Sequence, residues 1–144
     1  MASFNLFNKF LSQLANGGYN LGSDTLKFAL TNTAPTAATD TVFDPITKQP
    51  PPAAANGYTT GGHAATIDSS AESGGTYTLA CTTDVVITAT AGGIGPFRYV
   101  ILYDDTSATD MLIGYWDYGS SITLAAGETF TIDVTASLLT IAAA

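Results

Sequence analysis

Nucleophilic and metal chemistry have few candidate residues in this chain, which contains one histidine and one cysteine. Cys81 lies in the apolar run TYTLACTTDVV, and His63 lies in a glycine-rich stretch. A thiol nucleophile needs a neighbouring base, and these two residues are predicted to occupy different elements. We therefore interpret Cys81 as a small buried apolar residue. The sequence contains no Walker A, G-x-S-x-G or C-x-x-C motif, so we predict no cofactor, no metal site and no catalytic triad.

Three carboxylates gather in one polar stretch, Asp104, Asp105 and Asp110. Carboxylate oxygens are calcium ligands, but this spacing does not match the EF-hand loop, and no glutamate follows at the required distance. Aspartate is also common in turns, where it accepts hydrogen bonds from the main chain. We interpret the cluster as a turn.

Asp117 directly follows the only tryptophan, Trp116. A carboxylic acid among aromatic rings can act as a glycosidase acid, but it needs a second carboxylate across a cleft. Asp133 and Glu128 are the nearby candidates in the sequence. Strand alternation instead turns Asp117 to the face opposite Trp116, where Arg98 or hydroxyl groups can bind it. We favour this second interpretation and predict that the chain is not an enzyme.

Aromatic residues concentrate between positions 94 and 120, within two apolar runs. Tyr and Trp bury a large area while keeping a polar tip for a partner. They can therefore form a hydrophobic core, a protein interface or a platform for sugar rings. The residues concerned are Tyr99, Tyr103, Tyr115, Trp116 and Tyr118.

The charge balance excludes two classes of partner. The formal net charge is −8, and the chain has only four Lys and Arg residues, which are scattered. Such a chain cannot neutralise a row of phosphates, so we predict no binding to nucleic acid or to an anionic membrane surface. Neither an apolar run of the ~20 residues that a membrane span needs nor a convincing signal peptide is visible.

The stretch 94–120 is predicted to be the central hairpin of a β-sheet. Two apolar runs, 97–103 and 111–118, flank the aspartate-rich turn. Both runs are apolar at odd and even positions, which indicates strands whose two faces are covered. Residues 25–31 alternate between apolar and polar side chains, which indicates a strand with one buried face.

Further strands are predicted from short β-branched runs separated by turn residues. Residues 68–75 are expected to form a turn. The predicted strands are 57–67, 76–81, 84–90, 122–124, 129–134 and 138–141. Eight or nine short strands with frequent turns predict a mainly β fold, an antiparallel β-sandwich or jelly roll with one N-terminal α-helix.

That helix is predicted over residues 3–15, with Ser3 as its N-cap and Gly17 at its end. Its apolar face consists of Phe4, Phe7, Phe10, Leu11 and Leu14. Such a helix can pack on its own domain, or it can be an arm that docks on a neighbouring subunit. We expect an N-terminal helix or arm in residues 1–18 and a single β-sandwich domain in residues 19–144.

Residues 32–56 form a proline-rich excursion from this domain, with Val42 and Phe43 as its expected anchors. Pro50, Pro51 and Pro52 favour an extended polyproline conformation that gives no hydrogen bonds to a sheet. A connection of this length is usually either a contact surface or a solvated loop. Both alternatives remain open at this point.

Four strings carry a resemblance to a known group of proteins: SFNLFNKF, NLGSDTLKFALTNTAP, GGIGPFRYVILYDDT and LIGYWDYGSSITLAAGETFTIDV. In these strings the chain resembles small structural proteins of tailed bacteriophages. The resemblance covers most of the chain apart from the proline-rich segment and residues 68–75. The resemblance implies a virion protein made in the bacterial cytoplasm. Among virion proteins, the resemblance favours a capsid decoration (cement) protein that binds and stabilises the outer face of the shell. The alternative is a tail or fibre component that binds host glycans.

The expected partners are therefore the major capsid protein or other virion proteins, with the chain present in several copies or as a homo-oligomer. The resemblance carries no site residues, because the matching strings contain no reactive group. The expected contact residues come from the helix and the proline segment: Phe4, Phe7, Phe10, Leu11, Pro50, Pro51 and Pro52.

Overall fold

The computed structural model describes residues 2–44, 55–134 and 137–143. Ten strands and one short helix make up the described chain, which confirms the mainly β class and the position of the helix near the N-terminus. The elements are β1 (Phe4–Leu6), α1 (Asn8–Ala15), β2 (Leu26–Thr31), β3 (His63–Ala64), β4 (Ser69–Ser73), β5 (Thr76–Ala80), β6 (Val85–Thr88), β7 (Ile94–Asp104), β8 (Met111–Leu124), β9 (Thr129–Ile132) and β10 (Ser137–Ala142).

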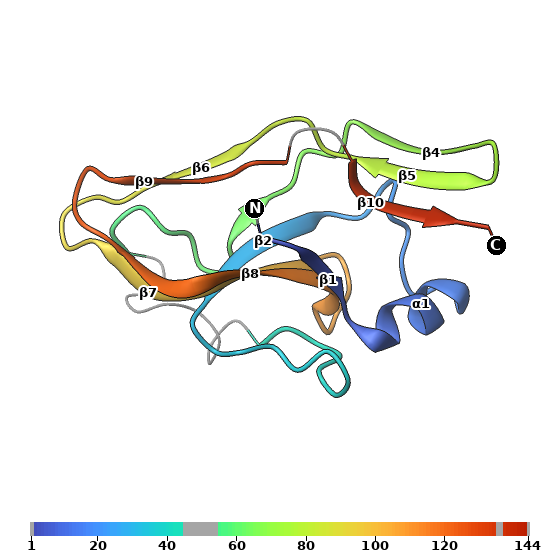
Figure 1. Ribbon diagram of the computed structural model, residues 1–144, viewed down its shortest axis with the longest axis horizontal. Coiled ribbons are helices and arrows are strands. Elements are labelled where there is room, and N and C mark those ends of the chain that lie inside the picture. Colours follow the sequence, from blue (N-terminus) through green and yellow to red (C-terminus); the bar gives the residue numbers. More distant parts are fainter. Residues whose placement is uncertain (1, 45–54, 135–136, 144) are drawn as a thin grey trace.

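The strands form a sandwich of two layers. One layer is a five-stranded antiparallel sheet in the order β1-β8-β7-β2-β3. The other layer contains a three-stranded sheet, β10-β5-β4, and a two-stranded sheet, β6-β9. Figure 1 shows the two layers one above the other, with α1 at the end of the sandwich near β1 and β10. The predicted antiparallel sandwich is confirmed.

The predicted hairpin forms the middle of the larger sheet. β7 pairs with β8 on one side and with β2 on the other, so that Ile101 lies opposite both Tyr115 and Ala29. β8 is longer than expected, because its pairing with β7 continues through register shifts as far as Leu124. The separate strand predicted at residues 122–124 is therefore wrong, and these residues are the end of β8.

Both faces of the five-stranded sheet are covered, and this corrects the expectation for β2. The prediction of a single buried face is wrong, because Ala29 and Thr31 on the face opposite Phe28 are 0 % and 1 % exposed. The chain after β2 folds back over this outer face and places Phe43 there, against Tyr103, with ring centroids 4.7 Å apart. The expected anchoring role of Phe43 is confirmed. Figure 1 shows this segment below the sheet.

The N-terminal helix begins later than predicted. Residues 4–6 form strand β1, which pairs with β8 and places Phe4 opposite Trp116. Phe7 occupies the N-cap position and makes no side-chain capping bond, so the prediction of Ser3 as the cap is wrong. The predicted end is confirmed, because Gly17 has a φ of 76° and the Gly18 N–H donates to the Gln13 carbonyl at 2.8 Å.

Two further expectations are wrong at the sheet edges. Residues 69–73, expected in a turn, form β4 and pair with β5 although all their side chains are exposed. Of the strand predicted at residues 57–67, only β3 forms. Glycine permits this abrupt change, because Gly62 has a φ of 91° and a Cβ there would lie 2.1 Å from the Phe28 carbonyl oxygen.

Replacement of Phe43 by alanine tests whether the outer face contributes to stability. The Phe43 ring is buried, whereas its neighbour Val42 is 42 % exposed. We expect Phe43→Ala to lower the free energy of unfolding by roughly 3 kcal/mol, because it leaves a cavity beside Tyr103. Val42→Ala should change it by less than about 1 kcal/mol. Urea denaturation measures both, and equal losses would contradict this account of the outer face.

Candidate interaction surface

The predicted contact residues of the N-terminal segment lie mostly inside the chain's own core. Phe7 and Phe10 are buried on opposite faces of the large sheet, where they pack against Tyr115 and Tyr19. Leu11 is 51 % exposed. Of the two alternatives for the helix, the structure therefore shows packing on its own domain. Pro50, Pro51 and Pro52 lie outside the described residues.

Phe4 is partly buried, and its ring holds β1 in place. It lies against the Trp116 ring, with centroids 4.5 Å apart, and directly over the main chain of Gly114. A Cβ on Gly114 would be 2.3 Å from Cζ of Phe4, so only glycine leaves room for this ring. The position of β1 thus depends on Gly114. A glycine inside an apolar strand is the sequence feature that could have indicated this close contact.

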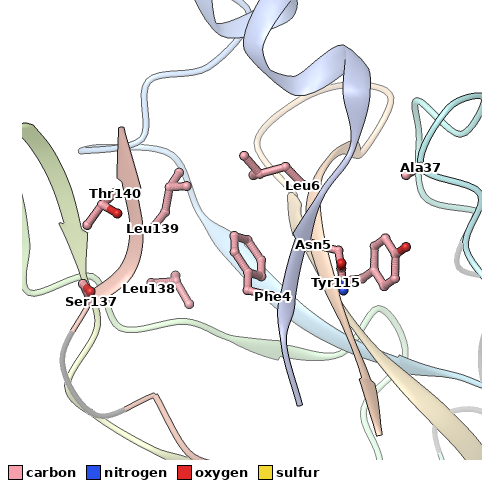
Figure 2. Close-up of a pocket in the computed structure, with 9 residues that line it drawn as sticks. All are labelled: Phe4, Asn5, Leu6, Ala37, Tyr115, Ser137, Leu138, Leu139 and Thr140. Carbon is pink, nitrogen blue, oxygen red and sulfur yellow. The ribbon is translucent and has the colours of Figure 1, made fainter. Parts of the chain in front are cut away.

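A groove of about 470 Å³ runs between β1 and β10. Phe4 and Leu6 point into it toward Leu138 and Leu139, as Figure 2 shows, while Asn5 points to the other side of the sheet. Side chains from both faces of β1 therefore border the groove, which places it beside the edge of the strand. All nine residues that line it are uncharged: Phe4, Asn5, Leu6, Ala37, Tyr115, Ser137, Leu138, Leu139 and Thr140.

Two strand edges that have no neighbouring strand in the described chain border this groove. β1 is the last strand of the five-stranded sheet, and β10 is the last strand of the three-stranded sheet. The Phe7 N–H donates to the Ile113 carbonyl at 3.2 Å, so residues 5 and 7 direct their main-chain groups toward β8. The main-chain groups of Phe4 and Leu6 consequently point away from β8. Within the described ranges, β1 and β10 are not neighbours in any sheet.

Asp117 makes an ion pair with Arg98. The guanidinium Nε and Nη2 donate to the two carboxylate oxygens at 2.7 and 2.8 Å. These hydrogen bonds lower the pKa of Asp117 to about 2, so the group is ionised at neutral pH and has no proton to give. The favoured interpretation of Asp117, as a partner of Arg98, is confirmed.

The aspartate cluster forms a turn between β7 and β8. Asp104 is buried and accepts hydrogen bonds from the Thr106 and Ser107 N–H groups. Asp105 pairs with Lys27 at 2.8 Å. In the part of the chain that the structure describes, no group of three His, Cys, Asp or Glu side chains could hold a metal ion.

The histidine and the cysteine have different surroundings, and both have altered proton affinity. Cys81 is fully buried, and burial raises the pKa of its thiol, which disfavours the reactive thiolate. His63 lies beside Tyr58, with ring centroids 5.8 Å apart. Its Nε2 atom is buried without a hydrogen-bond partner in the described chain, and burial lowers its pKa.

A second, smaller groove of about 220 Å³ lies on the larger sheet, next to β9. Trp116, Tyr118 and Phe130 contribute aromatic rings to it, with Thr131 and Asp133 at its border. Tyr118 is 58 % exposed and meets Phe130 edge to face. Trp116 packs against Phe4 and Phe28, so it serves the core as well as the groove. The remaining tyrosines of the aromatic stretch, Tyr99 and Tyr103, are buried.

The lowered pKa of His63 predicts a loss of stability on mild acidification. Its ordinary pKa is 6.5, so the unfolded chain takes up a proton more readily than the folded one. The free energy of unfolding should therefore fall as the pH drops below about 6.5. His63→Gln, which does not titrate, should flatten the curve between about pH 7 and 5.

Thermal unfolding across this pH range measures the effect. Asp117 provides an internal reference, because its lowered pKa means that its contribution is lost only from about its ordinary value of 3.8 downward. If His63→Gln keeps the full slope between about pH 7 and 5, the assignment to His63 is wrong.

The described ranges contain no helix long and apolar enough to cross a membrane. Comparison of the chain with protein-family models, with curated proteins and with solved structures finds no match.

Proposed function

We propose that this chain is a structural virion protein that decorates the outside of a capsid shell and stabilises it. The observation that carries the proposal is the groove between β1 and β10. It is uncharged and partly apolar, and two open strand edges border it. The resemblance of the chain to small structural proteins of tailed phages supports the same conclusion.

The groove has the chemistry of a protein contact. Its lining offers apolar anchors, one tyrosine, and small hydroxyl and amide groups. Interfaces between proteins rely on such anchors and on main-chain pairing at strand edges. The titratable groups discussed above serve other purposes, because Asp117 pairs with Arg98 and Asp105 pairs with Lys27. A role in assembly would use the apolar anchors and the strand edges of this surface.

The fold suits such a role because a packed core holds its shape, and the single cysteine permits no intramolecular disulfide. The sandwich has a continuous core between its layers and a second apolar cluster on the outer face of the large sheet. A protein that binds only the intact shell stabilises it by mass action. In this proposal the partly exposed Leu11 of α1 adds an apolar contact point, as expected from the sequence.

Binding to purified empty shells tests the proposal. We expect the protein to sediment with matching shells up to a saturating number of copies and to raise the shell's melting temperature. Thr140→Asp places a charge in the groove and should weaken binding at least about tenfold, a cost of about 1.4 kcal/mol. Thr129→Asp, at a threonine of β9 that is also exposed, is the matched control.

Three outcomes would overturn the proposal. Protein that stays in the supernatant with matching shells, bound protein that leaves the melting temperature unchanged, or equal effects of the two aspartate variants each contradict it. Circular dichroism of both variants verifies that the fold is intact.

The aromatic groove beside β9 supports a second candidate, a tail or fibre component that binds host glycans. Sugar rings stack on exposed aromatic faces, while carboxylate and hydroxyl groups bind their hydroxyls. Tyr118, Phe130 and Asp133 offer this combination.

Glycan-array binding distinguishes this candidate from the first. If it is correct, Tyr118→Ala should abolish binding without loss of stability, because the ring is largely exposed. Trp116→Ala is the less suitable test, since it also removes core contacts with Phe28. Tyr77→Ala, a partly buried tyrosine of β5, is the control. Absence of binding to any glycan, or binding that survives Tyr118→Ala, would contradict a sugar site here.

A further inference from the structure

We propose that the open edge of β1 pairs with β1 of a second copy of this chain, so that two five-stranded sheets join across a two-fold axis. The proposal names the partner of the β1 side of this groove and leaves the β10 side, with Thr140, to the shell. It therefore rests on the proposed function to the extent that this groove is a protein contact.

The hydrogen-bonding pattern of β1 fits an antiparallel copy of itself. Phe4 and Leu6 direct their N–H and C=O groups away from β8, because residues 5 and 7 use theirs toward it. An antiparallel copy places Phe4 opposite Leu6 of the partner, and Leu6 opposite Phe4. Each pair exchanges two main-chain hydrogen bonds, so the four polar groups on each edge are satisfied.

The side chains agree with this register. The two-fold axis passes beside Asn5, so that its exposed amide meets the same amide of the partner on the outer face of the sheet. Phe4 and Leu6 point to the opposite face, toward β10, as Figure 2 shows. The strand is therefore apolar where it faces the core and polar where it faces solvent. In the proposed pair, the apolar faces of both copies lie on the same side of the joined sheet.

The distribution of charge favours a second copy at this edge. The net charge of −8 disfavours contact between copies over most of the surface. The residues of β1 and β10 are all uncharged, and neither strand contains proline. Natural proteins usually protect an open strand edge with charges, proline or a bulge. The pairing of β10 with β5 is irregular between Ser137 and Leu139, whereas the edge of β1 carries no charge and no proline. A second copy can therefore continue the main layer at β1 without bringing carboxylates together.

A cysteine at the axis tests the register directly. Asn5 occupies the position that is not hydrogen-bonded in the proposed pair, where opposed Cα atoms lie about 4.5 Å apart, within disulfide range. We expect Asn5→Cys to form a covalent dimer with oxidised glutathione, at a rate that rises with protein concentration. Cys81 is fully buried, so the new thiol is the accessible one. Leu11→Cys, on the exposed side of α1, should remain monomeric.

Hydrogen exchange of the unmodified protein provides an independent readout. The amides of Phe4 and Leu6 should exchange rapidly at low concentration and become protected as concentration rises. The Phe7 amide, which donates to Ile113, should be protected throughout. If Asn5→Cys is folded but does not crosslink preferentially, or if the Phe4 and Leu6 amides stay unprotected at high concentration, the proposal is overturned.

Both measurements use free protein without shells, which separates this inference from the proposed function. Crosslinking with no shell binding supports the paired edge and contradicts the decoration role. Shell binding by a chain that remains monomeric supports the decoration role and contradicts the paired edge. Protection of Phe4 and Leu6 only when shells are added would show that a shell segment, and not a second copy, occupies the edge, and would also overturn the inference.

Discussion

The structure depends on the double pairing of β7. This strand forms main-chain hydrogen bonds with β2 and with β8, and its residues from Tyr99 to Asp104 are buried on both faces. A strand in this position has no route to water, so its polar main-chain groups require partners on both sides. The elements above and below it are arranged to keep that strand covered, and the single cysteine means that no intramolecular disulfide takes part.

Tyrosine hydroxyls complete the hydrogen bonding where strands end early. The Leu30 N–H, which lies beyond the end of the short β3, donates to the Tyr58 hydroxyl at 2.9 Å. The Tyr19 hydroxyl donates to the Leu112 carbonyl at 2.8 Å, and that of Tyr103 donates to Gly61. Burial raises the pKa of Tyr58 to about 12, so the group remains a neutral hydroxyl. In a chain with only 11 % charged residues, tyrosine hydroxyls thus satisfy several buried main-chain groups.

The sequence predicts those parts of the fold that are determined by local residue patterns, and fails where contacts between distant residues determine the structure. The central hairpin was predictable because its apolar runs are continuous and its turn is rich in aspartate. β4 was not, because its exposed residues Ser69–Ser73 carry no apolar pattern and it is held by main-chain pairing with β5. At the N-terminus, the spacing of Phe4, Phe7 and Phe10 predicts a helix that includes Phe4. The contact of Phe4 with Gly114 instead holds residues 4–6 in strand β1, and the helix begins at Asn8. The groove joins residues 4–6 to residues 137–140, a separation that no local pattern can show.

The edges on the far sides of the two sheets differ from those at the groove. β3 is only two residues long, and the hydroxyl of Tyr58 occupies the next donor of β2 beyond it. β4, the opposite end of the three-stranded sheet, carries the charged Glu72. The charge on β4 and the tyrosine hydroxyl beside β3 make these edges poor templates for another chain. A contact between the β1 edge and the same edge of a second copy is isologous, so it occupies that edge in both partners. Pairing through β1 therefore closes at two chains, and the larger sheet cannot propagate into an open-ended filament.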